Sequence, residues 1–597
     1  MRSKSFDSNA ASNQMDDLAD FSTNYRVLLL SVMAVVIGAF SSLVAYVLLW
    51  LIAVITNLAF YHHFSTASML PQGNHMGWWV VLVPVFGAMI IGLMARFGSE
   101  KIRGHGIPEA LEAILLGRSF ISLRVAILKP LSSAISIGTG GPFGAEGPII
   151  MTGGAFGSIF AQLFHLSAAE RKTLLVAGAA AGMSAVFDTP VAAVLLAVEL
   201  LLFEWKPRSF IPVAVASLVA SVLRVPLLGA GPIFPIPPHT VISSPELIIA
   251  AGLGVLAGFG SGLLTVLVYA LEDFFQKLPI HWMWWPAIGA IFVGVGGLVD
   301  PRVLGVGYDS IHSLLLGQIV GAAVISLLVA KALVWAIALG SGTSGGVLAP
   351  LLIIGGALGA LVGAWIPVGD VSLWSLVGMA AMMGGTMRSP LTAMIFAVEL
   401  TWDYHLFPVL LAGSVAAFGV TVLVMRRSVL TEKLARRGHH ITREYSTDPF
   451  EFIRVRDVMD KQVPIIPMSM KLSELYNRIA EGDANLSRRQ AILIVNDQTQ
   501  LVGIITRGDM VRALQQNPSP ETTVFDAGTT DLTMTFPEEP LQAALAKMLE
   551  KNIGRLPVVE PADKTKIVGY LGRAAILSAR KKLHEEENVR QRGWQFS

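Results

Sequence analysis

The sequence predicts a polytopic α-helical membrane protein that is duplicated internally and followed by a soluble α/β region. Only 14% of the 597 residues are charged, compared with about 25% in an average soluble protein. The charges are also unevenly distributed, because Val27–Ala95 contains no Asp, Glu, Lys or Arg, whereas Arg443–Ser597 is rich in them. A bilayer crossing needs about 20 apolar residues, so we expect Val27–Ile55 and Trp78–Met94 to be the first two crossings.

Charge and hydropathy also predict the order of the domains. We expect a polar N-terminus at 1–24, a membrane domain at 25–438, a linker at 439–453, soluble modules at 454–516 and 517–582, and a charged tail at 583–597. Residues 1–24 lack the apolar core and cleavage site of a signal peptide, so no cleavage is expected. The last apolar segment is followed by the basic residues Arg426, Arg427, Lys433, Arg436 and Arg437. The positive-inside rule predicts that they lie in the cytoplasm, and we expect both termini there.

Two apolar segments, Gly138–Pro148 and Gly340–Pro350, are interrupted by clusters of glycine and proline. Irregular backbone at membrane depth occurs only where protein or a water-filled pathway satisfies the freed hydrogen-bonding groups. Close helix packing through small residues is the simpler explanation for many of the 57 glycines. The clustering of the breaks favours a pathway at these two places.

The two breaks belong to an internal repeat, which we place at about 78–222 and 248–425. A shift of 202 residues preserves the residue type at Gly138, Gly140, Gly144, Pro148, Gly153, Gly154, Ala155 and Gly157. A shift of 200 residues does the same at Pro190, Ala193, Ala197, Val198, Glu199 and Leu200. Interrupted helices at equivalent positions of two repeats indicate a transport site near the bilayer midplane.

The chemistry of the breaks favours an anion at that site. A half-helix presents unpaired N–H groups and a partial positive charge at its N-terminus. A cation pathway would instead need several carboxylates or exposed carbonyls. The breaks contribute one acid, Glu146, and otherwise backbone, so we expect the membrane domain to conduct an anion.

Several segments resemble, in order, the motifs of the CLC family of chloride channels and proton-coupled anion exchangers. The resemblance covers about Val27 to Gly438 and includes Lys129. Its motifs are GHGIPE at 104–109, GAEGP at 144–148, GVLAP at 346–350 and LTEKL at 430–434. It implies two inverted-topology repeats and a homodimer in the plasma membrane of a bacterium. Each subunit would contain one pathway for chloride or a similar small anion.

The resemblance also implies roles for individual residues. Glu146 would be the gate, whose carboxylate occupies the pathway when deprotonated and swings aside when protonated; a structural, hydrogen-bonded acid is the alternative. Glu199 and Glu399, at the ends of matched helices, are expected to be structural. The anion would be bound by His105, Gly106, Ile107, Gly144, Ala145, Gly147, Val347, Leu348, Ala349 and Leu430.

Four positions depart from the family pattern. His105 and Leu348 stand in place of the usual serine and phenylalanine, and Leu430 stands in place of a tyrosine that closes the site from inside. Leu200 stands where exchangers commonly have a proton-relaying glutamate. The changes at Leu200 and Leu430 favour channel-like or weakly coupled conduction. A proton/anion antiporter with a proton route through His105 or Glu204 is the alternative, in which case Glu204 is more than an interfacial charge.

Two alternatives are also open for the role of His105 in anion binding. A neutral imidazole can donate through one nitrogen and a charged one through both, so His105 could bind the anion directly. It could equally be turned aside and hydrogen-bonded to the backbone. Burial and a helix N-terminus oppose its protonation, whereas a nearby anion favours it.

The soluble region resembles a pair of CBS modules. Residues 491–495 and 501–506 are expected to be strands and 509–514 a helix, and the order recurs at 556–559 and 567–571. In such modules a T-x-x-D segment commonly holds a nucleotide, so Thr506, Arg507 and Asp509 predict an adenine nucleotide. The second copy, GRAA at 572–575, has lost both groups. A ligand-free dimerisation platform is the alternative.

Other classes of function fit less well. A CBS-linked divalent cation transporter would need clustered carboxylates at membrane depth, and only Glu146 lies in a break. No zinc-protease pattern or Ser/His/Asp arrangement is present, so no enzyme is expected. The absence of cysteine excludes thiolate chemistry, and the net charge of +2 gives no sign of nucleic-acid binding. We expect no metal site and no required cofactor.

Overall fold

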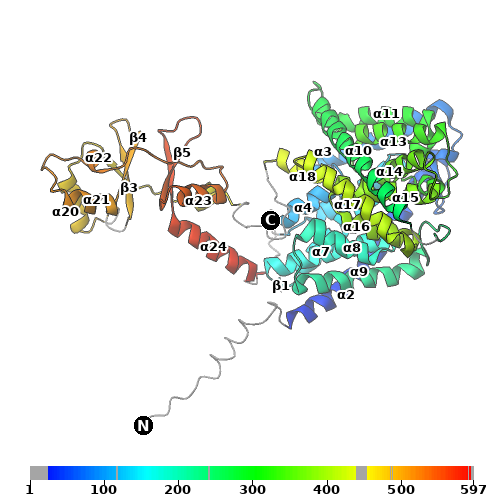
Figure 1. Ribbon diagram of the computed structural model, residues 1–597, viewed down its shortest axis with the longest axis horizontal. Helices are drawn as coiled ribbons and strands as arrows, with labels where there is room; N and C mark the ends of the chain where they lie inside the picture. Colours follow the sequence, from blue (N-terminus) through cyan, green and yellow to red (C-terminus); the bar gives the residue numbers. More distant parts are fainter. Residues whose placement is uncertain are drawn as a thin grey trace, which may run out of the picture. The chain divides into compact units, whose positions relative to one another are not determined.

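A computed structural model of the chain describes residues 25–115, 119–239, 243–438, 453–483, 486, 489–588 and 591–592. The described residues form two compact units (Figure 1). The first contains the residues up to Gly438 together with Gln591 and Arg592, and the second contains the residues from Ile453 to Asn588. The predicted N-terminal segment at 1–24, nearly all of the linker, and residues 589–590 and 593–597 of the charged tail lie outside the described residues.

The first unit is a bundle of apolar helices. Among the described residues, seven helices are long and apolar enough to cross a membrane. The first two of them, Arg26–Tyr61 and Gly77–Phe97, confirm the crossings expected from the charge-free N-terminal stretch. Shorter apolar helices, including Leu348–Gly363, lie among them. Short apolar helices follow from the glycine and proline breaks, because a broken helix cannot span the bilayer alone.

The helices of the first unit occur twice in the same order. The pairs are α2 (Arg26–Thr56) and α10 (Ser244–Gln276), α3 (Leu82–Phe97) and α11 (Trp285–Val299), α4 (Ile107–Leu115) and α12 (Tyr308–Leu315), α5 (Leu123–Gly138) and α13 (Ala322–Gly340), α6 (Glu146–Gln162) and α14 (Leu348–Gly363), α7 (Ala168–Phe187) and α15 (Val371–Met387), α8 (Pro190–Leu196) with η5 (Ala197–Leu202) and α16 (Pro390–Thr401), and α9 (Pro207–Leu228) and α17 (Phe407–Val424). The duplication therefore starts at α2, earlier than the residue matches indicate.

Short elements connect these helices. They are η1 (Asn57–Tyr61), η2 (Pro71–Gly73), η3 (Gly77–Val81), η4 (Glu100–Ile102), η6 (Trp282–Trp284), η7 (Pro301–Val303), η8 (Tyr404–Leu406) and the final helix α18 (Val429–Arg436). A two-residue strand, β1 (His165–Leu166), pairs antiparallel with β7 (Gln591–Arg592). No other strand occurs among the described residues of this unit.

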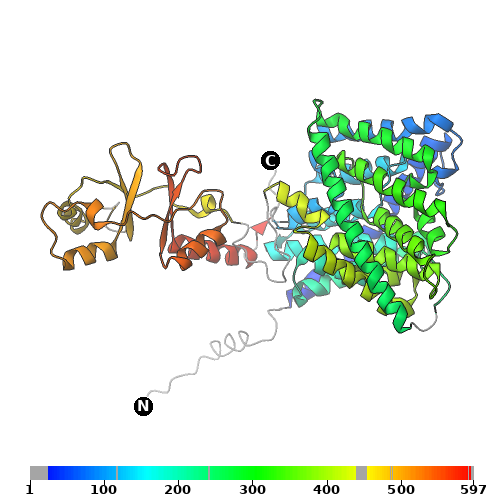
Figure 2. The same cartoon turned by 45° about the horizontal axis from the view of Figure 1, so that its top comes forward.

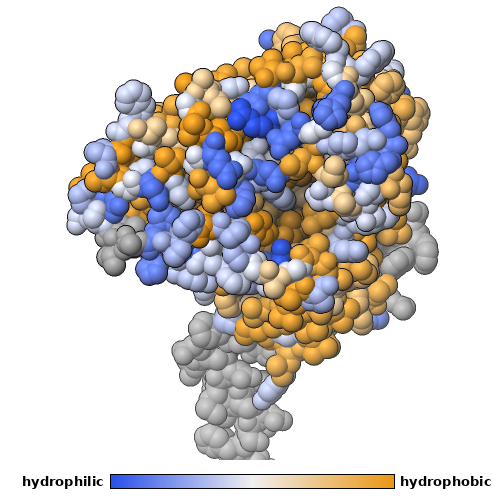
Figure 3. Space-filling view, turned by 90° about the vertical axis from the view of Figure 1, so that its right-hand side faces the viewer, coloured by the Kyte–Doolittle hydropathy of each residue, from blue (hydrophilic) through white to orange (hydrophobic). Residues whose placement is uncertain are grey.

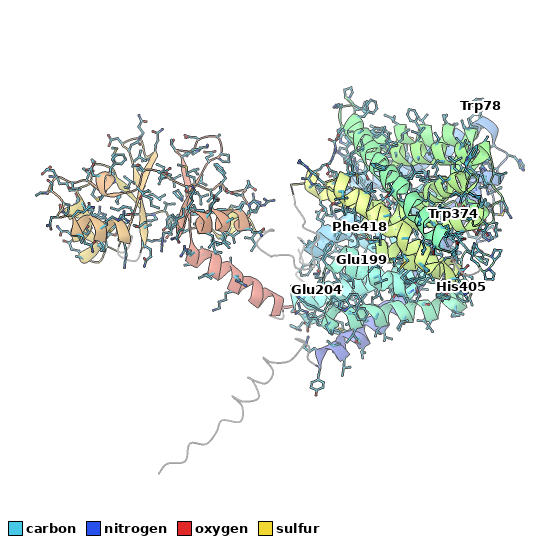
Figure 4. All side chains as sticks on the ribbon, viewed as in Figure 1. Trp78, Glu199, Glu204, Trp374, His405 and Phe418 are labelled. Atoms are coloured by element: carbon cyan, nitrogen blue, oxygen red, sulfur yellow. The ribbon has the colours of Figure 1, made fainter. Side chains whose placement is uncertain are left out.

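The two halves have inverted topology. Glu204 follows η5, and His405 follows the equivalent helix α16. The two residues are 201 positions apart, one more than the shift of 200 residues that relates these helices. Figure 4 places these two residues toward opposite ends of the bundle, with Trp78 at the same end as His405. Equivalent helices pack against equivalent neighbours, as α2 does against α9 and α10 against α17 (Figure 2). We call the end that carries Trp78 and His405 the outer face, and the end that carries α18 the inner face.

Small residues bring the helices after each break close together. A side chain on Gly153 would collide with the carbonyl oxygen of Gly178, and one on Gly355 would collide with that of Gly378. These contacts join α6 to α7 and α14 to α15. Many of the repeated glycines are therefore packing positions, so both explanations of the glycine content hold, at different places.

Glu199 and Glu399 tie the two halves together. The carboxylate of Glu399 accepts hydrogen bonds from the N–H groups of Val191 and Ala192 at the start of α8, at 3.0 and 2.8 Å. The carboxylate of Glu199 does the same at the start of α16, at 3.3 Å from Leu391 and 2.8 Å from Thr392. Each acid thus caps the helix of the other repeat, where N–H groups lack helical partners. This geometry agrees with the structural role expected for both.

The second unit contains two small sheets flanked by helices. The first sheet has the order β2 (Ile465–Pro467), β3 (Ala491–Val495) and β4 (Leu501–Thr506), and the second pairs β5 (Arg555–Val559) with β6 (Ile567–Gly572). The helices are α19 (Val455–Val458), α20 (Leu472–Ala480), α21 (Arg507–Gln515), α22 (Val524–Ala527), α23 (Leu541–Glu550) and α24 (Arg573–Asn588). The predicted strands and the helix after β4 are confirmed.

The two modules of the second unit share a core. Leu493 and Leu501 from the first sheet pack with Val559 and Tyr570 from the second. In addition, Val455 at the start of the first module packs in the core of the second. These contacts make the pair of modules a single folded body.

Candidate functional site

Three glycine-rich segments from both repeats meet in the middle of the first unit. Gly144 and Gly346 pair across the two breaks, with the N–H of Gly346 donating to the carbonyl of Gly144 at 2.9 Å. Gly104 pairs in turn with Ser344, and its N–H donates to Thr343 at 3.1 Å. Helices α4, α6 and α14 each begin directly after these segments. The first N–H groups of a helix have no partner within that helix, so three N-termini converge on one place.

The predicted binding residues lie at these helix starts. Ile107, Gly147 and Leu348 are buried within the first two positions of their helices. Gly144, Ala145 and Val347 lie just before helices α6 and α14, and Ala349 is the second residue of α14. A side chain on Gly147 would collide with the carbonyl oxygen of His105. The structure therefore brings the three family-like segments together, although 242 residues separate Gly104 from Gly346 in the sequence.

Glu146 lies at the junction of these segments. Its side chain is fully buried, and Oε1 accepts a hydrogen bond of 3.1 Å from the N–H of Ala349. Oε2 has no hydrogen-bond partner among the described residues. A Cβ atom on Gly144 or Gly346 would overlap the carboxylate, so glycine at both positions leaves it room. The carboxylate thus occupies the place where helix N-termini would hold an anion.

His105 and Glu109 form the inner side of the site. The ring of His105 is buried, and its Nδ1 has no hydrogen-bond partner among the described residues, so the nitrogen is not bonded to the backbone. Glu109 accepts a hydrogen bond of 2.9 Å from the N–H of Gly106. The predicted donor at Gly106 is therefore already engaged by its own helix. In the tautomer that carries its proton on Nδ1, His105 can donate to an anion.

Lys129 holds in place the segment from Ile102 to Gly106, directly before α4, which we call the inner loop. Its buried ammonium donates to the carbonyls of Ile102 and Gly104, at 2.9 and 2.7 Å, and to the hydroxyl of Ser344, at 3.1 Å. Three donors therefore find three acceptors, as the chemistry of an ammonium allows. Lys129 connects α5 to the loops of both repeats, so it positions the segment that contains His105.

Lys433 and Leu430 lie on α18 beside this loop. Lys433 forms an ion pair of 2.7 Å with Glu109, and a side chain on Gly104 would collide with its ammonium. Leu430 is fully buried. The hydroxyl of Tyr269 donates to the carbonyl of the neighbouring Val429 at 2.5 Å, so this tyrosine anchors α18. A positive charge therefore stands close to the inner loop.

Glu204 has other partners. Ser209 donates to it at 3.0 Å and Lys206 forms an ion pair with it at 3.0 Å. Burial alone would raise the pKa of its carboxyl, but the charges of Lys172, Lys206 and Arg208 outweigh burial and lower that pKa. A carboxyl held in its charged form is poorly suited to relay protons. No hydrogen bond joins it to Glu146 or His105 among the described residues.

Thr506 and Asp509 form the capping box of α21. The N–H and hydroxyl of Thr506 donate to Asp509 at 2.9 and 2.7 Å, and Asp509 returns a hydrogen bond from its N–H at 3.2 Å. Asp509 also pairs with Arg512 at 3.3 Å. Thr523 and Asp526 form the same box at α22. The T-x-x-D pattern therefore has a structural explanation that applies to both helices.

Three residues near the site were not predicted from the sequence. Glu109 was only part of a motif and Lys433 only part of a basic cluster. Lys331 repeats the environment of Lys129 in the second half, with its ammonium donating to the carbonyls of Val303 and Gly305 at 2.9 and 3.3 Å. The shift of 202 residues that relates the breaks also relates the two lysines, so the signal was available.

Comparison with known proteins identifies both units. The family model described as "Voltage gated chloride channel" matches residues 86–422, and that of the CBS domain matches 455–516 and 524–582. A protein of Ralstonia nicotianae named "Putative chloride channel protein ClcB-like" is 28% identical over 387 residues, 62% of this chain and 88% of its own length.

Two solved structures share the fold. A slow cyanobacterial Cl⁻/H⁺ antiporter has a TM-score of 0.61 and 21% identity, covering 70% of this chain and 98% of that one. A eukaryotic CLC transporter has a TM-score of 0.60 and 20% identity, covering 92% and 98%. The family match covers more than half of the chain and coincides with the bundle that holds the site. The protein is therefore an integral membrane member of the CLC family of anion transporters, with a C-terminal pair of CBS domains.

Proposed function

We propose that this protein conducts chloride or a similar small anion through the site at Glu146, which acts as the gate. The observation that carries the proposal is the position of the Glu146 carboxylate. It accepts the N–H of Ala349 at a helix start and has one oxygen without a partner. A carboxylate in this place is an internal competitor for the anion, because both are bound by the same N–H groups.

Protonation provides a way to open the gate. A neutral carboxyl is a weaker ligand for helix N-termini than a carboxylate. Once protonated, Glu146 no longer competes, and an anion can take the vacated N–H groups. Anion flux should therefore rise as the pH falls, and it should saturate when the carboxyl is fully protonated.

Weak coupling to protons is the second part of the proposal. Leu200 is buried and apolar, so it cannot pass a proton from the inner face to Glu146. Glu204 is held by cations, and Leu430 offers no hydroxyl to close the inner side. The competing possibility is an antiporter that uses His105, whose Nδ1 has no partner among the described residues. Both candidates share the anion site and differ only in proton movement.

The test of the proposed function is anion efflux from liposomes that contain the purified full chain. With potassium and valinomycin balancing the charge, we expect chloride to leave proteoliposomes faster than it leaves empty liposomes. Nitrate and fluoride, offered in place of chloride, would rank the anions. Efflux no faster than from empty liposomes for all three anions would defeat the proposal.

We further propose that the protein is a homodimer in a bacterial plasma membrane, with the CBS pair in the cytoplasm. The basic residues on and beside α18 support this orientation. They include Arg427, Lys433 and Arg437, and basic residues at the end of an apolar segment favour the cytoplasmic side. Exposed apolar side chains on helices α9 and α17, such as Leu218 and Val422, fit contact with lipid or a second copy.

Nucleotide binding to the CBS pair remains a prediction. The capping box satisfies Thr506 and Asp509 without a ligand, but Oδ2 of a capping aspartate could exchange its partners for ribose hydroxyls. We expect calorimetry on the full chain in detergent to detect ATP binding that Asp509→Ala abolishes. Asp526→Ala, which removes the matching box at α22, is the control for loss of a cap. Absence of binding at millimolar ATP would leave the pair as a ligand-free platform.

A further inference from the structure

The second repeat contains a copy of the inner loop that the proposed function does not use. Gly305 and Gly307 have φ of 68° and 81°, as Gly104 and Gly106 have φ of 86° and 89°. Helix α12 begins at Tyr308 directly after this loop, as α4 begins directly after the inner loop. Because the repeats are inverted, this second loop approaches the centre of the bundle from the outer face.

Lys331 completes the copy. It is fully buried and donates to the carbonyls of Val303 and Gly305, so one of its three N–H donors is unused. Among the described residues it forms no ion pair; Asp300 pairs instead with Arg302 at 2.7 Å. Lys331 also interacts electrostatically with Glu146. A buried, unpaired ammonium is costly unless an anion compensates it.

Tyr308 adds a second unused donor. Its ring lies against Phe187 and Phe234, with centroids 6.1 and 6.0 Å apart. Its hydroxyl is buried and has no hydrogen-bond partner among the described residues. Like Lys331, it interacts electrostatically with Glu146, whose Oε2 also lacks a partner. Buried polar atoms without partners are rare in folded proteins, so the unpartnered hydroxyl of Tyr308, together with the spare N–H of Lys331, indicates a ligand.

We propose that the Tyr308 hydroxyl and the Lys331 ammonium form an additional binding subsite for a small monovalent anion, on the outer side of Glu146. An anion there would accept hydrogen bonds from both unused donors and would lie next to the gate. The outer face is hollowed near its centre, with hydrophilic residues around the hollow (Figure 3), which fits access from this side. The inference rests on the proposed function, since the subsite serves the same pathway.

The first test is the dependence of flux on chloride concentration in Tyr308→Phe. Removing one hydrogen bond to an anion, about 1.5 kcal/mol, corresponds to a rise of about tenfold in the half-saturating chloride concentration. Tyr404→Phe, which alters an exposed tyrosine on the same face, should leave that concentration unchanged. An unchanged value in Tyr308→Phe would overturn the subsite.

A double variant separates a role toward the anion from a role toward the gate. In the Glu146→Gln background, Tyr308→Phe should raise the half-saturating chloride concentration by the same factor as in the wild type. If Tyr308 only held the carboxylate, its effect would vanish in that background, and the assignment to an anion would be wrong.

Bromide provides a test that depends on neither flux nor the folding of a variant at Tyr308. In crystals of the full-length Glu146→Gln protein grown in bromide, we expect an anomalous peak within hydrogen-bonding distance of Tyr308 Oη and Lys331 Nζ. Absence of a peak there, with bromide present at the helix N-termini, would overturn the subsite but leave the proposed function intact. Absence of transport in the wild type would defeat the proposed function instead.

Discussion

Replacing Glu146 with glutamine is expected to abolish most of the pH dependence of anion flux while preserving the flux. Glutamine has nearly the shape of the protonated carboxyl and carries no charge at any pH. Wild-type flux should rise at least about tenfold as the pH falls from about 8 to about 4, the range in which buried carboxyl groups titrate. The variant should remain at the high level throughout. Efflux from liposomes at a series of pH values measures both.

The matched control is Glu100→Gln. Glu100 is an exposed carboxylate of the same unit, so its loss should leave the pH dependence as in the wild type. If Glu146→Gln retains the full pH response, Glu146 is a structural acid and the gate lies elsewhere.

Replacing Lys129 with methionine is expected to have the second largest effect. The change removes the ammonium that donates hydrogen bonds to the carbonyls of Ile102 and Gly104 and to the hydroxyl of Ser344. Ser344 keeps its bonds to Ser132 and Ser133, and the carbonyl of Gly104 keeps the N–H of Gly345. The buried carbonyl of Ile102 loses its partner among the described residues, which costs about 1–3 kcal/mol. The inner loop should lose its fixed position, and the site should lose a nearby positive charge. We expect flux to fall at least about tenfold, since 1.4 kcal/mol corresponds to a factor of 10.

The control for this change is Lys277→Met, which removes an exposed lysine just after α10. Thermal unfolding of both variants in detergent shows whether the loss of flux comes with a loss of folded protein. Lys129→Met with normal flux and normal stability would show that the inner loop holds its position without the lysine.

Much of the membrane fold was accessible from sequence because its signals are local. Charge-free stretches of sufficient length predicted the first crossings, and the clustered glycines predicted the breaks. The shift of 202 residues predicted that the breaks are related, and the structure shows them paired directly through Gly144 and Gly346. Chemistry then pointed to Glu146 as the one acid in the breaks.

The part of the site that the sequence did not predict depends on contacts between segments that are far apart in the sequence. Nothing local connects Lys433 with Gly104, because α18 returns to the inner loop only after both repeats are complete. The shift of 202 residues relates Lys331 to Lys129, but the loop GVGY, which contains Tyr308, lies 201 residues after GHGI and differs from it at two of four positions. Side-chain substitutions hid a correspondence that the backbone preserves.

Hydrogen-bond accounting also lies beyond sequence patterns. The motif identified Gly106 as a donor for the anion, whereas its N–H is engaged by Glu109. The T-x-x-D pattern predicted a nucleotide, although the same four residues suit a helix cap equally well. In both cases the residue type was informative, but its partner depends on how the backbone folds locally.

The measurement that tests the central claim most directly is the reversal potential of the full chain in planar bilayers under opposed chloride and proton gradients. A weakly coupled anion pathway predicts that the reversal potential follows the chloride gradient and changes little when the pH gradient is reversed. A reversal potential that ignores the chloride gradient would contradict anion conduction. One displaced by the proton gradient in a fixed ratio would contradict weak coupling.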